Sequence, residues 1–175
     1  DFADVAAFYA NDWGNWKVSA GYAYTWVESA VTTGNEADLH QVGGTIMHTP
    51  TGLGVYGMGQ WEDTSGAPDT QAYGVKPFWK ASISPLGATV FYGEWARYED
   101  QFGGLVGDDL CGGGGCFVVG SEVERYGLGV VQEINPAAMH VFARWQHQEL
   151  DVDITNTNVD FEDWDLFQAG GIIFF

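Results

Sequence analysis

Residues that could perform covalent chemistry are few and scattered along this chain of 175 residues. The four histidines, His40, His48, His140 and His147, have no nucleophile motif near them. His140 and His147 are an odd number of residues apart, so on an extended strand they would point to opposite faces. There is no G-x-S-x-G elbow and no phosphate-binding glycine loop that precedes a helix. We therefore expect a protein that is not an enzyme.

The two cysteines enclose a run of glycines, Cys111-Gly-Gly-Gly-Gly-Cys116. A zinc site needs about four ligands, and no Cys or His pair lies close to this run in the sequence. The spacing suits a small disulfide formed in an oxidising compartment, with two free thiols as the alternative. Such a disulfide would close a loop, and it suggests no reactive role.

Acidic residues dominate the charge of the chain, with 24 Asp and Glu against 6 Lys and Arg and a net charge of −18. This balance argues against nucleic acid as a partner, because carboxylates would face phosphates. Asp151, Asp153 and Asp160 crowd one polar segment and are candidate Ca²⁺ ligands, since Ca²⁺ prefers oxygen ligands. Their spacing matches no EF-hand, and a solvated acidic surface is the simpler interpretation.

Alternation of apolar and polar residues is the commonest pattern in the chain and predicts β-strands with two different sides. In segment 16–26, Trp16, Tyr24 and Trp26 face one way, whereas Lys17 and Ser19 face the other. Pro77 cannot donate to a ladder and would demand a bulge or a gap in its strand. Comparable alternation occurs in segments 4–11, 39–48, 70–79, 88–98, 124–133, 139–148 and 166–175, and segment 54–61 is ambiguous in phase.

The connections between these segments are sorted by length. Short turns are expected at 12–15, 49–52, 84–87 and 134–137, and longer polar loops at 27–38, 63–69, 99–123 and 151–163. Transmembrane barrels have short periplasmic turns and longer extracellular loops. No run approaches the ~20 apolar residues of a membrane-spanning helix. The pattern predicts an all-β transmembrane antiparallel barrel, with residues 1–175 as one domain or its C-terminal portion.

The number of predicted strands does not match that of a complete barrel. Counting segment 4–11 gives about nine strands, whereas barrel chains normally have an even number. Either the chain is the C-terminal part of a larger barrel, or residues 1–15 are not a spanning strand and 16–175 form a complete eight-stranded barrel. No basic and apolar signal segment opens the chain, so we expect a mature, processed or truncated form.

Three segments carry a resemblance to a known family: Val75-Lys76-Pro77-Phe78-Trp79-Lys80, the stretch 120–133, and 163–175, which ends on Phe175. They resemble the C-terminal half of porins from Gram-negative alphaproteobacteria, over most of the chain and most strongly after about Thr70. The resemblance implies a homotrimer of barrels with roughly 16 strands, set among the lipid and lipopolysaccharide of the bacterial outer membrane. The chain departs from the family in length, since it lacks several strands and the inward-folded constriction loop.

These expectations lead to a passive channel for small hydrophilic solutes and ions. A small barrel with a structural or binding role and no wide pore is the first alternative, and a soluble secreted β-sandwich is the second. In the channel interpretation, polar members of the alternations line the pore, because a charge on the lipid side would cost ~2–4 kcal/mol. Each cation could equally pair with a neighbouring carboxylate. The pore-lining candidates are Lys17, Lys76, Lys80, Glu94, Arg125, His140, Arg144 and Gln146.

Overall fold

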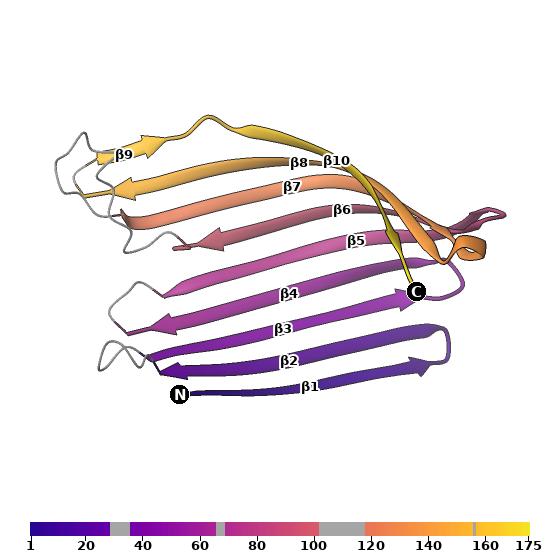
Figure 1. Cartoon of the computed structure of the whole chain (residues 1–175), viewed down its shortest axis with the longest axis horizontal. Helices are drawn as coiled ribbons and strands as arrows, with labels where there is room; N and C mark the ends of the chain where they lie inside the picture. Colours follow the sequence, from indigo (N-terminus) through magenta and orange to yellow (C-terminus); the bar gives the residue numbers. More distant parts are fainter. Residues whose placement is uncertain (29–35, 66–68, 102–117, 156) are drawn as a thin grey trace.

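The structure, a computed structural model, describes residues 1–28, 36–65, 69–101, 118–155 and 157–175. It is all-β, and its long strands lie side by side in one layer in chain order (Figure 1). The elements are β1 (Phe2–Trp13), β2 (Trp16–Glu28), β3 (Glu36–His48), β4 (Leu53–Thr64), β5 (Thr70–Ser84), β6 (Gly87–Glu99), β7 (Val118–Ile134), the 3₁₀ turn η1 (Asn135–Ala137), β8 (Met139–Ile154), β9 (Thr157–Asp160) and β10 (Trp164–Ile173).

Every strand pairs antiparallel with its neighbour, and β9 and β10 both pair with β8. Among the described residues β1 and β10 are the edges and no pairing joins them, so this sheet is open. The antiparallel all-β prediction is confirmed at this level. β1 pairs with β2 along its whole length, from Phe2↔Val27 to Trp13↔Trp16. Residues 2–13 therefore form a full strand of the sheet, which the alternative of a complete eight-stranded barrel over 16–175 does not expect.

The short turns fall where the sequence predicts them and lie together at one end of the sheet, opposite the strand ends that the longer connections join (Figure 1). The long polar loop expected at 151–163 is wrong. β8 continues to Ile154, and β9 begins at Thr157 and pairs with β8 from Ile154↔Thr157 to Asp151↔Asp160. Alternate apolar residues explain the difference, because Val152 and Ile154 pack against Val118 with Leu150 and Phe161 beside them. The intervening aspartates hide this period of two.

Pro77 interrupts the ladder as the sequence predicts. The pairing of β5 with β6 runs through Val75↔Trp95 and resumes at Phe78↔Tyr92 in the same register, without pairs at the two residues between them. The missing amide hydrogen of proline accounts for such a gap. The side-chain phase of both strands is the same on either side of it.

The pairing registers divide the side chains into two faces that extend across the whole sheet. One line of partners runs Trp16, His48, Leu53, Trp79 and Phe91. The face that carries these residues is called the aromatic face. A second line, on the opposite side of the pleat, belongs to what is called the polar face; it runs Lys17, Met47, Gly54, Phe78, Tyr92, Gly129, Arg144 and Gln168.

The polar face is concave over β5–β8. Glu94 on β6 and Gln146 on β8 form a hydrogen bond above β7, and Lys80 Nζ on β5 lies 2.7 Å from Glu133 Oε1 on β7, above β6. Strands two positions apart are separated by about 9–10 Å. Their side chains converge on the inner side of a curve, so the aromatic face is the outer side.

Little of the described chain is buried. The buried apolar residues are small or cluster at one end of the sheet: Ala72, Ala81, Ala96, Val118, Val152 and Ile154. A soluble sheet normally packs its apolar face against a second layer, and the described residues form a single layer. In the part of the chain that the structure describes, no helix is long and apolar enough to span a membrane.

Two turn glycines provide a matched test of the backbone. Gly14 has φ +60° with nothing within 4 Å of an added Cβ, whereas Gly52 has φ +69° and an added Cβ would lie 1.9 Å from Lys80 O. Gly14→Ala should cost the left-handed penalty of ~1–2 kcal/mol. Gly52→Ala should lose about 1–3 kcal/mol more, the cost of overpacking. Urea unfolding followed by Trp fluorescence measures both, and equal losses would contradict this register.

Candidate functional site

All eight predicted pore-lining residues lie on the polar face. Register places Lys17 level with Arg144, and Glu94 level with Gln146 through Gly127. The same alternation puts Lys76, Lys80, Arg125 and His140 on that side. Their common face follows from the period of two alone. Their role in lining a pore stays a prediction.

A chain of polar contacts crosses the concave side of the sheet. Lys76 Nζ lies 2.8 Å from Glu94 Oε2, and the Glu94 side chain is 7% exposed. The amide of Gln146, 3% exposed, donates to the other oxygen of Glu94. Lys76 also lies 4.6 Å from the centre of the Tyr92 ring. These contacts hold one cation and one carboxylate in fixed positions on the polar face.

Gly127 leaves the space that this chain of contacts needs. It lies on β7, between Glu94 and Gln146 in the register. An added Cβ at Gly127 would lie 2.4 Å from Trp145 O and 3.2 Å from the Gln146 Cα. Because Gly127 has no side chain, Gln146 on β8 can donate a hydrogen bond to Glu94 on β6 across β7.

The remaining cations of the polar face have different partners. Lys80 pairs with Glu133 at 2.7 Å, as expected if the cations pair with neighbouring carboxylates. Arg144 Nε donates to Gln168 Oε1 at 2.8 Å, and the Arg125 guanidinium lies 5.2 Å from the centre of the Tyr98 ring. Pairing with a carboxylate thus describes Lys76 and Lys80, whereas Arg144 and Arg125 contact neutral groups.

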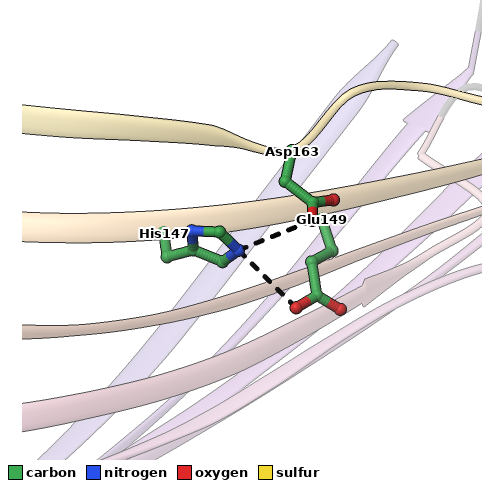
Figure 2. Close-up of side chains that lie close together, drawn as sticks. All are labelled: His147, Glu149 and Asp163. Carbon is green, nitrogen blue, oxygen red and sulfur yellow. Dashed lines mark ion pairs between the residues drawn. The ribbon is translucent and has the colours of Figure 1, made fainter.

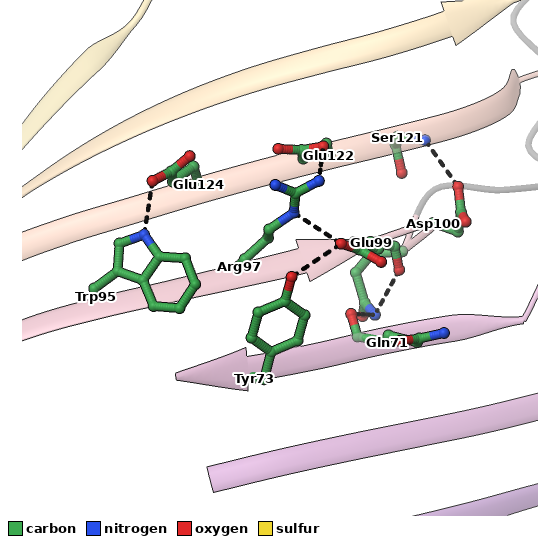
Figure 3. A network of polar contacts seen from close by, with 10 residues as sticks. Gln71, Tyr73, Trp95, Arg97, Glu99, Asp100, Ser121, Glu122 and Glu124 are labelled. Atoms are coloured by element: carbon green, nitrogen blue, oxygen red, sulfur yellow. Dashed lines mark hydrogen bonds and ion pairs between the residues drawn. The ribbon is translucent and has the colours of Figure 1, made fainter. Parts of the chain in front are cut away.

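The aromatic face repeats one contact that the sequence analysis missed. An aromatic donor on one strand bonds a carboxylate on the next, displaced diagonally by two residues toward the long connections, a separation that long side chains span. Figure 3 shows Tyr73 with Glu99 at 3.1 Å and Trp95 with Glu124 at 2.6 Å. The same diagonal joins Tyr24 to Asp38, Tyr126 to Glu149 and Trp145 to Asp165. The sequence holds a signal for these contacts: an acidic residue lies two positions beyond the residue that pairs with each aromatic in the ladder.

Arg97 lies among these carboxylates, which are called the acidic row: Asp38, Glu99, Glu124, Glu149 and Asp165. Its guanidinium lies 2.8 Å from Glu99 Oε1 through Nε and 2.6 Å from Glu122 Oε2 through Nη2. Figure 3 shows the Arg97 guanidinium between Glu99 and Glu122. Nearby, Asp100 accepts a hydrogen bond from the backbone amide of Ser121. Arg97, the one Lys or Arg residue on the aromatic face, is thus level with the donor Tyr73 and paired with two carboxylates.

Between two aromatic rows, the aromatic face carries no charged side chain in the strands described. The row at the short-turn end includes Trp16, Trp79 and Phe91, and the row nearer the long connections includes Tyr24 and Trp95. This stretch, called the apolar band, includes Val18, Ala20, Val42, Ile46, Val55, Val75, Leu128, Val130 and Ala143.

Two predicted sites are not assembled by the described residues. Cys111 and Cys116 lie outside them, so the disulfide stays a prediction. Of the Ca²⁺ candidates, Asp151 and Asp153 are exposed on β8, and the side chain of Asp160 is outside the described set. The structure instead brings a different group together, in which Asp163 meets a histidine and a glutamate of β8.

No protein-family model, curated protein or solved structure matches the chain. The fold alone defines its class, an open antiparallel sheet with an aromatic outer face and a polar inner face. The likeness to porins stays an expectation from the residues.

Removing the cation beside Glu94 should destabilise the protein. Lys76→Met leaves a carboxylate that is 7% exposed without its ion pair, a loss of about 1–3 kcal/mol. Lys80→Met is the matched control, because that pair is more exposed, and its loss should be about 0–1 kcal/mol. Denaturant unfolding measures both, and a larger loss at Lys80 would contradict the order.

Proposed function

We propose that this chain forms part of a transmembrane β-barrel of the bacterial outer membrane whose polar face lines a water-filled channel. The channel would allow passive diffusion of small hydrophilic solutes and ions. One observation carries the proposal: an uncharged apolar band between aromatic rows on the outer face, opposite an inner face that holds most of the cations. Of the six basic residues, five are on the polar face, namely Lys17, Lys76, Lys80, Arg125 and Arg144.

The exposed residues of the outer face favour hydrocarbon as its solvent. Phe167 is 77% exposed and Leu128 63% exposed, and both lie on the aromatic face. From Trp16 to Tyr24, β2 advances by about 26 Å along its own axis, which at a barrel tilt of ~35–45° is a height of about 18–21 Å, against the ~25 Å band of outer-membrane barrels. A charge placed within such a band is costly, and the described band has none.

Between β4 and β8, the aromatic row nearer the long connections crosses the strands at an angle typical of barrels, whereas the row at the short-turn end follows the register from β2 to β6. Trp61 on β4 is level, by register, with Asp151 on β8, whereas the row reaches β8 at Trp145, six residues lower. Six residues span about 20 Å and four strand spacings about 19 Å, so the row is inclined at about 45°. Barrel strands tilt by ~35–45° from the axis, so a row that follows a membrane surface would cross them in this way.

Closure of the barrel requires partners for both edges. Each strand is antiparallel to its neighbour from β1 to β10. When β9 and β10 are counted as one strand, β1 and β10 run in the same direction, so they cannot close an antiparallel barrel by pairing with each other. Unpaired backbone groups in hydrocarbon each cost several kcal/mol. We propose that both edges pair with further strands in a barrel of roughly 16, as a homotrimer. The pairing of β1 along all of β2 supports this larger barrel over the eight-stranded one.

Two alanines of β2 distinguish a membrane barrel from a soluble sheet. Ala20 lies on the aromatic face in the middle of the band, and Ala23 lies on the polar face. In lipid vesicles Ala20→Arg should destabilise by ~2–4 kcal/mol. Ala23→Arg should change stability by about 0.5 kcal/mol or less. Because Ala20 is exposed, a soluble protein would tolerate both substitutions, and equal effects would contradict the membrane assignment.

Ion selectivity tests the channel itself. Lys17→Gln and Arg144→Gln each remove one positive charge from the polar face, so the reversal potential in planar bilayers should shift toward cation selectivity. Arg97→Gln removes the same charge from the aromatic face and should leave selectivity unchanged. Absence of any conductance from the folded protein would favour a barrel without a wide pore.

A further inference from the structure

Three potential metal ligands meet at the edge of the aromatic face, outside the proposed channel (Figure 2). His147 Nε2 lies 3.6 Å from Glu149 Oε1 and 3.8 Å from Asp163 Oδ2. One ligand atom from each residue falls within 4.8 Å of the other two. The group is called the His147 cluster below, and it has one imidazole nitrogen and two carboxylates.

A bulge brings Asp163 to this position. Asp160 pairs with Asp151, and Trp164 pairs with Gln148. Between these pairs β8 has the two residues 149–150, whereas the opposing strand has the three residues 161–163. One extra residue of this kind redirects side chains at the edge of a sheet. Here the bulge brings the Asp163 carboxylate over the face that His147 and Glu149 share.

Further contacts orient the ligands before any ion arrives. His147 Nδ1 lies 3.1 Å from Asp165 Oδ1, and the same oxygen accepts from Trp145 Nε1 at 2.8 Å. A carboxylate on Nδ1 favours the tautomer with its proton there, so the lone pair of Nε2 points at Glu149 and Asp163. Tyr126 donates to Glu149 Oε1 at 3.0 Å. Metal-binding histidines usually have such a second hydrogen bond.

We propose that the His147 cluster binds a divalent transition-metal ion of the Zn²⁺ type. Zinc bonds of ~2.0–2.1 Å place tetrahedral ligands about 3.3 Å apart. The 3.6 and 3.8 Å separations from His147 require only a small contraction, and the two carboxylates, which lie within 4.8 Å of each other, must approach by up to about 1.5 Å. Imidazole suits Zn²⁺ and its neighbours, whereas Ca²⁺ takes six to eight oxygen ligands. Two carboxylates balance the ion's charge, and the fourth position remains for water or an external anion.

The cluster is open to solution at the edge of the apolar band. The side chains of His147, Glu149 and Asp163 are 19%, 45% and 55% exposed. His147 lies two residues beyond Trp145 toward the long connections, so the cluster falls outside the uncharged stretch. An ion could therefore enter from water without crossing the polar face.

Calorimetric titration of the folded, metal-free protein in detergent with Zn²⁺ alone tests the proposal. One site is expected, with Ca²⁺ and Mg²⁺ bound far more weakly. His147→Ala should weaken this site by at least about 100-fold, and Asp165→Asn, which affects only the positioning of the imidazole, by about 10–100-fold. His140→Ala is the matched control, because it lies on the same strand and opposite face, and it should bind like the parent protein.

Circular dichroism of each variant separates lost binding from lost folding. Folded His147→Ala that binds Zn²⁺ as tightly as the parent would overturn the proposal, as would Ca²⁺ binding at equal affinity. The two cysteines are intact in every variant, so zinc held by their thiols would persist in His147→Ala. If His147→Ala does not fold, the folded Asp165→Asn and Glu149→Gln variants decide: unchanged affinity in both overturns the site.

Discussion

The pleat of an extended backbone is the constraint on which the rest of this structure depends. Successive side chains point to opposite faces, and register passes that alternation from strand to strand. Trp16 and Phe91 share a face only because every intervening pair keeps the same phase. A slip of one residue in β5 or β8 would place Lys76 or Arg144 on the outer face and expose the apolar band to a charge. Both proposed roles, lipid-facing for one side and channel-facing for the other, depend on this single periodicity.

Curvature gives the two faces different chemistry. On the inner side, groups from strands two positions apart come within hydrogen-bonding distance, so Glu94 is held between Lys76 and Gln146 above Gly127. On the outer side, side chains spread apart, and the polar atoms of the aromatics bond to acids on adjacent strands. These bonds lie toward the long connections, where a membrane surface would meet water. The acidic row and the His147 cluster extend from them.

The sequence was sufficient for most strands and their phase, because alternation and turn residues are local signals, but it left the phase of segment 54–61 ambiguous. It placed Lys17, Glu94 and Arg144 on one side correctly for that reason. It failed at 151–163, where aspartates between Val152 and Ile154 hid a continuing strand. It also missed the meeting of Asp163 with His147. That contact depends on a bulge in the strand that pairs with β8. A local sequence pattern does not predict that one of two paired strands has an extra residue.

Tryptophan fluorescence in lipid vesicles tests the central claim, that hydrocarbon covers the aromatic face. Of the eight tryptophans, register places only Trp164 on the polar face and the others on the aromatic face: Trp13, Trp16, Trp26, Trp61, Trp79, Trp95 and Trp145. Lipids brominated on their acyl chains should quench most of the emission, and aqueous acrylamide should quench little of it. Strong quenching by acrylamide together with weak quenching by brominated lipid would show that water covers this face, and would contradict the account.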